Sequence, residues 1–508
     1  MKLNNIKYIK LFCTVLVFMT FACQKLIEDP KGNLVKSSFF KTEADLAAAV
    51  TACYYPFQEA QWNSWNSSRM WIPLMGADDL TTHPAWNKQS FRELDRFVGT
   101  DMNNDVRDAA WKTPFHMVIA AANVMENYEK VLVPGREAIV NQYVAQARFL
   151  RAFAYFWMTR VFGDLPLVTS TKTDLNIPLS KVKDIYALII DDLQFAEANL
   201  PDSWPGEPGK PNKWTAESLL ASVYLTMGGW PLKATENYAL AATAAKDVID
   251  NGPYTLLPNF ADLWTLANKN NNEYIWAIQM IDVASSQSTT TAGLTTMPDE
   301  EGGWDDVFFE IGFYNRFPSG PRKDATFHTV FQDGPGAPIT DFRNSITKHP
   351  FIEKYRDGCL WYLPDYGGNT YTAGRNICHL RFAEILLCYA EAQARGADPS
   401  TDAYAAVNRV RTRAGLANLQ PGLSQSAFCD SIVAERGWEL AGEYSRWFDL
   451  IRTEKVEEMA ALKDPLDLQP LAPPDIKIYH AHIPNSEILL NPKLGLGHDA
   501  GYGTDYPK

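Results

Sequence analysis

The chain has 508 residues and a hydrophobic content of 46%, which is enough for a sizeable core and excludes a globally disordered chain. Its formal net charge is −13 and it carries no long basic run, so a nucleic acid is not an expected partner. The 15 tryptophans are more than a helical core usually needs, which suggests that some are displayed for binding.

Residues 1–22 are predicted to be a lipoprotein signal peptide. A start with three lysines precedes an apolar run from Leu11 to Ala22, and these 12 residues are too short to span a bilayer. Cys23 follows the small Ala22, which resembles a bacterial lipobox, although Thr20 stands where the strict pattern has leucine. We expect Cys23 to be lipidated and residues 23–40 to form a tether; the alternative is plain secretion.

Most of the chain after the tether has the pattern of helices. Apolar residues recur at helical spacing, and prolines, glycines and capping residues bound the runs. The predicted helices are residues 41–57, 105–129, 136–161, 181–199, 214–227, 238–249, 378–395, 401–413 and 425–453. The pair at 214–227 and 238–249 has alanines at close-packing positions, which resembles the tetratricopeptide pattern.

The remaining segments break the helical rhythm and are rich in Gly, Pro, Asn and aromatic residues, with a short strand predicted at 273–278. We expect a mainly α fold, a scaffold of helical pairs that carries an irregular, partly β insert. It would form a single domain over residues 41–508. Its parts would be a scaffold at about 41–60, 105–250 and 378–455, a loop-rich ligand subdomain at about 61–104 and 251–377, and an irregular C-terminal segment at 456–508.

The stretch from Gln146 to Val168 is predicted to be the central helix of the scaffold. Helix formers run unbroken to Val161, and a glycine and a proline then stop them. Apolar residues lie on most of its faces, which is typical of a helix buried between other helices. Arg148, Arg151 and Arg160 interrupt it, so each is expected to meet a carboxylate or to lie at an edge.

Several segments in order resemble the SusD/RagB family, the surface lipoproteins of Bacteroidota nutrient-uptake systems. The segments are RFLRA at 148–152, FGDLPL at 162–167, WTA at 214–216, RFAEILL at 381–387, NRVR at 408–411, RWFDL at 446–450 and IP at 483–484. The resemblance covers nearly the whole chain. It implies a tetratricopeptide-like scaffold, a SusC-like TonB-dependent outer-membrane transporter as partner, and capture of a nutrient, usually an oligosaccharide.

The charged residues of these segments are predicted to be structural. A ladder of charged side chains spaced by three and four residues runs along 435–449, and such a ladder more often pairs with neighbouring helices than performs chemistry. Its members are Glu435, Arg436, Glu439, Glu443, Arg446 and Asp449. Arg148, Arg151, Arg381 and Glu384 are interpreted in the same way.

Ligand binding is predicted on two loops, because scaffolds position variable loops for recognition. A sugar needs flat aromatic rings to stack on and planar amides, carboxylates or guanidinium groups as hydrogen-bond partners. Residues 78–89 and 302–316 offer both. The predicted ligand-binding residues are Trp86, Trp304, Tyr314, Asn87, His83, Asn315, Arg316 and Asp305. The alternative is that several of these aromatics pack under long loops.

Catalysis is not predicted. The adjacent carboxylates at 78–79 and 305–306 do not have the arrangement of a glycosidase pair, and such pairs are usually solvated or bind a metal. No HExxH or phosphate-loop motif occurs in the sequence, and no cofactor is expected. Ca²⁺ on the acidic loops stays open, without a ligand spacing that would assign it.

The preferred hypothesis is a non-catalytic lipoprotein of the outer membrane that faces the cell exterior. It would capture an oligosaccharide and deliver it as a hinged lid to the SusC-like transporter that the resemblance implies. A RagB-like peptide-binding lipoprotein is the alternative, since a peptide would use more backbone-directed polar groups and fewer stacking rings. A third possibility is a structural adaptor without a ligand of its own.

Overall fold

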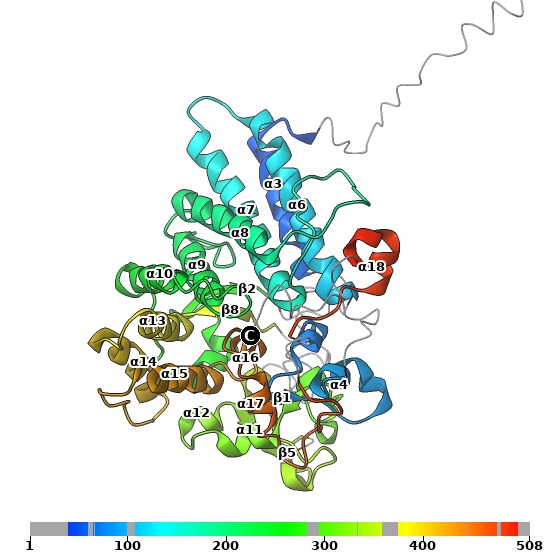
Figure 1. Ribbon diagram of the computed structural model, residues 1–508, viewed down its shortest axis with the longest axis vertical. Coiled ribbons are helices and arrows are strands. Elements are labelled where there is room, and N and C mark those ends of the chain that lie inside the picture. The colour runs from blue at the N-terminus through cyan, green and yellow to red at the C-terminus, as the bar shows by residue number, and fades with distance from the viewer. Residues whose placement is uncertain are drawn as a thin grey trace, which may run out of the picture.

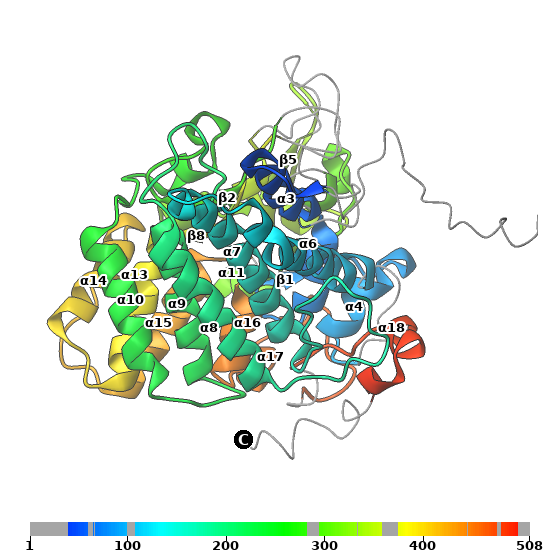
Figure 2. The same ribbon diagram turned by 90° about the horizontal axis from the view of Figure 1, so that it is seen from above.

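The computed structural model describes residues 39–58, 65, 67–98, 107–281, 294–332, 334–357, 374–443, 445–474 and 479–495. The long helices lie side by side in a curved array, in which each helix packs against the next (Figures 1 and 2). They are α3 (Glu43–Cys53), α6 (Thr113–Asn127), α7 (Glu137–Phe162), α8 (Val182–Asn199), α9 (Lys213–Gly228), α10 (Asn237–Asn251), α13 (Phe382–Gly396), α14 (Thr401–Arg413) and α15 (Gln425–Glu439). The predicted mainly α fold is confirmed. Within the described ranges, none of the helices has the length and apolar character needed to span a bilayer.

Local sequence signals set the starts of these helices. The Thr42 side chain caps α3 by accepting the backbone N–H of Asp45, whose carboxylate accepts the N–H of Thr42 in return. Asn212 caps α9 in the same reciprocal manner, and Ser400 and Ser424 cap α14 and α15.

Helix α7 lies at the centre of the core, as predicted. Every residue from Val144 to Phe162 is buried except Arg148 and Arg160, which are half-buried. The helix ends at Gly163, whose φ of +74° favours glycine. Because α6 and α8 pack along its two sides, most of its surface is removed from water, which contributes about 25 cal/mol per Å² of apolar area.

The arginines of α7 meet three different environments. Arg151 donates to both carboxylate oxygens of Asp192 on α8, at 2.7 and 2.8 Å. Arg148 lies 3.3 Å from Asp191 at the half-buried edge of the same helix pair. The guanidinium of Arg160 instead lies between two rings, 3.8 Å from the centre of Phe156 and 3.9 Å from that of Phe448. Arg160 is therefore held by cation–π contacts.

Two predicted helix boundaries were wrong. The helix expected from Cys378 begins only at Phe382, because residues 377–381 form strand β8 (Ile377–Arg381), which pairs with β2 (Tyr274–Ile278). The helix expected over 425–453 is divided into α15 and α16 (Arg446–Arg452). Gly442, with φ of +70°, lies between them, and its N–H donates to Asp79 at 3.2 Å. Tertiary hydrogen bonds override the helical pattern in both places.

The irregular part is built from short elements around small sheets. The described residues form four two-stranded antiparallel sheets. Besides β2 with β8, these pair β1 (Leu80–Thr81) with β3 (Phe308–Phe309), β4 (Phe327–His328) with β7 (Phe351–Ile352), and β5 (Val330–Gln332) with β6 (Ile339–Asp341). The short helices are α4 (Gln89–Asp95), α11 (Ile311–Arg316), α12 (Pro321–Asp324), α17 (Val456–Ala460) and α18 (Asn485–Leu490). The predicted strand at 273–278 is confirmed as β2.

Most of the described tryptophans serve the core, whereas Trp204, Trp304 and Trp438 are half-buried. The buried ones are Trp65, Trp71, Trp111, Trp157, Trp214, Trp230, Trp264, Trp276 and Trp447. Trp65, Phe153 and Trp276 form one aromatic cluster with centroid separations of 5.0 and 4.9 Å. The excess of tryptophan therefore reflects large side chains that fill the space between α7 and the irregular part.

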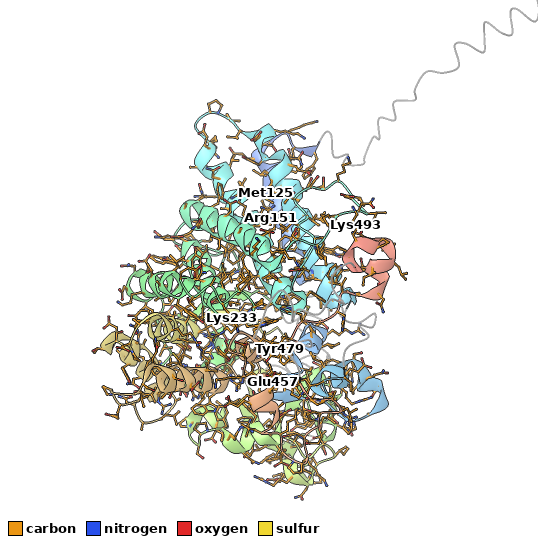
Figure 3. All side chains as sticks on the ribbon, viewed as in Figure 1. Met125, Arg151, Lys233, Glu457, Tyr479 and Lys493 are labelled. Carbon is orange, nitrogen blue, oxygen red and sulfur yellow. The ribbon has the colours of Figure 1, made fainter. Side chains whose placement is uncertain are left out.

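The C-terminal segment returns over the scaffold. Tyr479 donates its hydroxyl to the carboxylate of Glu457 at 2.6 Å, and the two residues lie close together in Figure 3. The N–H of Ala481 donates to the carbonyl of Val161 at the end of α7, at 2.7 Å. This segment covers the end of the central helix.

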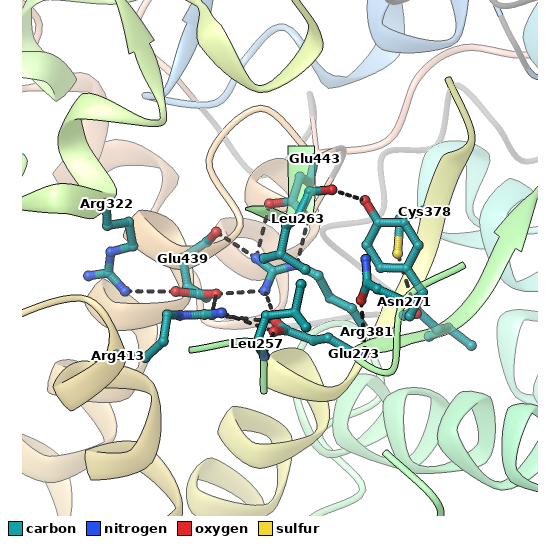
Figure 4. Close-up of polar contacts among 12 residues, drawn as sticks. Leu257, Leu263, Asn271, Glu273, Arg322, Cys378, Arg381, Arg413, Glu439 and Glu443 are labelled. Atoms are coloured by element: carbon teal, nitrogen blue, oxygen red, sulfur yellow. Dashed lines mark hydrogen bonds and ion pairs between the residues drawn. The ribbon is translucent and has the colours of Figure 1, made fainter. Parts of the chain in front are cut away.

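A network of buried ion pairs fastens α15 to the irregular part (Figure 4). Glu439 accepts from Arg381 at 2.6 Å and from Arg322 at 2.9 Å, and it also pairs with Arg413. Burial alone would raise the pKa of Glu439, but these three arginines hold it well below its usual range. Glu443 lies 2.8 Å from Arg381. The prediction that this ladder is structural is confirmed.

Candidate functional site

The two loops predicted to bind ligand lie side by side, although more than two hundred residues separate them. Strand β1 in the first loop pairs with β3 in the second, with Leu80 opposite Phe309 and Thr81 opposite Phe308. The N–H of Glu310 continues this ladder by donating to the carbonyl of Asp79 at 2.9 Å. Strand β1 lies in the lower half of Figure 1, away from α3 and α7. We call residues 78–89 and 302–316 together the paired loops.

Side chains strengthen this pairing beyond the short sheet. The Thr82 hydroxyl donates to the backbone carbonyl of Asp306 at 2.7 Å, and Lys88 forms an ion pair with the Asp306 carboxylate. The side chains of Lys88 and Asp306 are only 11% and 12% exposed. Burial raises the pKa of Asp306, and the charge of Lys88 opposes this shift. Two partly desolvated charges therefore hold the loops in one register.

Trp304 projects from a tight turn that only glycines permit. Gly302 has a φ of +78°, and a Cβ atom at Gly303 would lie 2.0 Å from the carbonyl oxygen of Met297. The N–H of Gly303 donates to the carbonyl of Pro298 at 2.9 Å. Trp304 follows directly and is half-buried. A recognition ring on a rigid turn loses little conformational entropy when a ligand binds.

Further bonds anchor the same turn. Glu301 is buried and accepts from the N–H of Gln332 at 2.9 Å and from Arg356 at 2.5 Å. The Asp305 carboxylate accepts the N–H of Asp299 at 2.9 Å. Burial raises the pKa of Asp305 to about 7, so this carboxyl is partly protonated near neutral pH.

The remaining predicted residues differ in their surroundings. Asn87 and Asn315 are exposed. His83 is half-buried, and its Nδ1 accepts the N–H of Ala85 at 2.9 Å. Burial and the charge of Lys88 lower the pKa of His83, which favours the neutral ring. Because Nδ1 already accepts from Ala85, the Nε2–H of this ring is the group left to donate to a ligand. The side chain of Trp86 and all of Cys23 lie outside the described part of the chain.

Tyr314 and Arg316 are engaged within the fold. The Tyr314 ring packs edge-on against Phe327 at 5.0 Å and Phe342 at 5.3 Å. Arg316 donates to the Leu462 carbonyl at 2.8 Å and to Asp78 at 3.0 Å. Both side chains are only half-buried, and their contact with ligand stays a prediction.

The adjacent carboxylates support the fold, which corrects the interpretation of such pairs as solvated or metal-binding. Asp78 is buried against Arg446, with 2.6 Å between Oδ1 and Nε. Asp79 is buried beside it, and burial together with the charge of Asp78 raises its pKa to about 6. The described residues contain no group of three or more His, Cys, Asp or Glu side chains that could hold a metal ion. No local pattern in the sequence indicates that Arg446 reaches Asp78, because the two residues are 368 positions apart.

The fold is a scaffold of paired helices that carries an irregular part, in which the paired loops lie side by side. Two family models match the chain: one described as the SusD family over residues 334–494, and one described as starch-binding associating with outer membrane over residues 33–225. The chain belongs to the SusD family.

Relatives and solved structures agree with this assignment. A SusD-like protein P2 from Formosa agariphila is 29% identical and is covered over its whole length by 98% of this chain. A SusD-like protein from Bacteroides ovatus is 28% identical over 88% of this chain and 82% of its own length. A SusD superfamily protein from Parabacteroides distasonis superposes with a TM-score of 0.76 at 24% identity, covering 89% of this chain and 98% of its own. A laminarin-binding SusD-like protein has a TM-score of 0.73 at 22% identity, with coverage of 89% and 98%.

Proposed function

We propose that this protein is a non-catalytic outer-membrane lipoprotein that captures an oligosaccharide on the paired loops and delivers it to a SusC-like TonB-dependent transporter. The observation that carries the proposal is that Thr82 and Lys88 of the first loop both bind Asp306 of the second, by a hydrogen bond and an ion pair. These contacts hold the two loops together, and the loops carry the exposed amides of Asn87 and Asn315 and the half-buried Trp304.

The chemistry of the paired loops suits a neutral sugar. The apolar face of a sugar ring can stack on Trp304, and the exposed amides of Asn87 and Asn315 can donate to and accept from hydroxyl groups. Both cations of the paired loops, Lys88 and Arg316, are already paired with carboxylates inside the protein. The family description as starch-binding and the laminarin-binding relative support the same ligand class.

Delivery would use the tether as a hinge. The described chain begins at Phe39, and a fully extended tether of some fifteen residues reaches about 50 Å from a lipidated Cys23. Ligand held between the protein and the transporter would favour the closed arrangement, provided that it binds this arrangement more tightly than the open one. The lid movement and the partner are part of the proposal.

Calorimetric titration with maltooligosaccharides, laminarin oligosaccharides and xyloglucan oligosaccharides tests the ligand class. Trp304→Ala should weaken binding of the recognised oligosaccharide by about 1–3 kcal/mol, the usual effect of removing an anchoring aromatic. Trp438→Ala is the matched control, since Trp438 is a half-buried tryptophan of α15. Equal affinities of both variants would contradict the proposed site, and binding of peptides without oligosaccharides would favour the RagB-like alternative.

A further inference from the structure

A cavity lies in the scaffold, apart from the paired loops. It has a volume of about 540 Å³, within the range of small-molecule sites. Its walls come from α3, α7, β2 and the loop at 206–210, and neither of the paired loops contributes a lining residue. Helices α3 and α7 lie in the upper half of Figure 1, whereas β1 and β5 lie in the lower half. We call this the scaffold cavity.

Aromatic rings form much of its wall. Tyr54, Tyr143 and Trp276 all line the cavity. Trp276 is fixed in place because its Nε1–H donates to the carbonyl of Gly209 at 3.0 Å. A Cβ atom at Gly209 would lie 2.7 Å from the Gln279 side chain, so the loop can approach β2 this closely only with glycine there. The Trp276 ring is thus held in place before any ligand arrives.

Amide and hydroxyl groups complete the lining. Gln146 is only 1% exposed, and its Oε1 accepts the Tyr54 hydroxyl at 3.1 Å, which leaves a second lone pair on this oxygen. The Tyr143 hydroxyl has no hydrogen-bond partner within the described part of the chain. An exposed amide, Gln58, lies at the rim. The cavity therefore offers both donors and acceptors beside flat rings.

The charges at the cavity cancel. Glu207 and Lys210 both line it and form an ion pair with each other at 2.6 Å. An anionic ligand would need an uncompensated cation, and a lipid chain would need a wall without the phenol and amide groups of Tyr143 and Gln146. Flat rings with amides and no net charge instead suit a neutral, polyhydroxylated ring compound.

We infer that the scaffold cavity is a second carbohydrate-binding site, which takes one or a few neutral sugar units between Tyr54, Tyr143 and Trp276. It does not depend on the paired loops, and it goes beyond the proposed function because a capture surface alone requires a single site. Two separate sites on one chain would also retain a long or multivalent glycan better than either site alone.

The experiment compares single-site variants of the mature protein with the three oligosaccharide classes named above. Calorimetry should give two binding events for the wild type. Tyr143→Ala should remove one event or weaken it at least about tenfold, whereas Trp304→Ala should affect the other. Tyr55→Ala is the matched control, since Tyr55 is 60% exposed and does not line the cavity.

A cavity-filling variant guards against a folding defect. Ala47 lines the cavity from α3 and is half-buried, so Ala47→Phe should block the same event while the melting temperature stays near that of the wild type. A single event that only Trp304→Ala weakens would overturn the second site and leave the paired loops standing. A single event that only the Tyr143 and Ala47 variants weaken would support the scaffold cavity against the paired loops. Absence of binding to all three classes would overturn both sites.

Discussion

The Thr82 hydroxyl donates a 2.7 Å hydrogen bond to the carbonyl of Asp306, a residue 224 positions further along the chain. Both residues are buried, with Thr82 only 1% exposed. The bond joins the two loops just where the β1–β3 ladder ends. The arrangement of the paired loops consequently depends on a long-range contact and not on either loop alone.

Thr82→Val tests this coupling. The substitution leaves the buried Asp306 carbonyl without its donor, so the free energy of unfolding should fall by about 1–3 kcal/mol. Oligosaccharide affinity should fall as well, because Trp304 lies on the same loop as Asp306, two residues before it. Chemical denaturation and calorimetry measure the two effects. Thr243→Val is the control, since Thr243 is exposed on α10 and its hydroxyl bonds within its own helix at 2.9 Å. Equal losses in both variants would contradict the coupling.

Glu439→Gln tests whether the ladder of charges is structural. The change leaves Arg322, Arg381 and Arg413 in a buried site with one negative charge fewer. Breaking a buried network in this way should lower the free energy of unfolding by about 3–5 kcal/mol. Oligosaccharide affinity, measured under conditions where the variant is folded, should stay unchanged because Glu439 is fully buried.

The control for this prediction is a second Glu-to-Gln change. Glu454 pairs with Lys233 at the surface, where the two side chains are 33% and 37% exposed. Glu454→Gln should cost less than about 1 kcal/mol. A cost for Glu439→Gln as small as that of the control would show that the network does not stabilise the fold.

The sequence predicted the scaffold well, because helical periodicity and caps are local signals. The central helix α7 ends at Phe162, one residue beyond the predicted Val161. Arg151 meets a carboxylate, that of Asp192, which is one of the two environments expected for it. The two wrong boundaries lie where residues 377–381 and Gly442 bond to distant segments. A local pattern does not contain those partners.

The candidate site could be predicted only in part. Composition identified the two loops, but not that β1 and β3 would join them. Composition also could not distinguish a tryptophan that faces solvent from one that fills the core. Trp65 and Trp276, for example, are buried against α7. The scaffold cavity was missed altogether, because its walls come from four segments that are far apart in the sequence.

Asp305→Asn tests the electrostatics of the turn that presents Trp304. Burial raises the pKa of Asp305 to about 7, above the unfolded value of about 3.9. Between about pH 4 and pH 7 the folded state therefore keeps a proton that the unfolded state loses, and this residue lowers stability as the pH rises. Asparagine removes the titration, tolerates the φ of +52° at this position, and can still accept the N–H of Asp299.

The stability of Asp305→Asn relative to the wild type should thus increase from pH 4 to pH 8. Melting temperatures of both proteins across this range measure the difference. Other buried carboxyls with raised pKa values, such as Asp79 and Glu217, contribute equally to the pH dependence of both proteins. Their contributions therefore cancel in the difference. A difference that is constant with pH would contradict the raised pKa of Asp305.

Cys23→Ala tests the membrane anchor. A multiply acylated cysteine gains about 0.8 kcal/mol per buried methylene, which makes anchoring stable, and no helix in the described ranges could replace it by spanning the bilayer. Cell fractionation should find the Cys23→Ala protein released from the membrane, while a Cys429→Ala control, changed at a buried free cysteine of α15, stays membrane-bound. Retention of a Cys23→Ala protein whose first 22 residues have been cleaved would show that something other than a lipid holds the protein there.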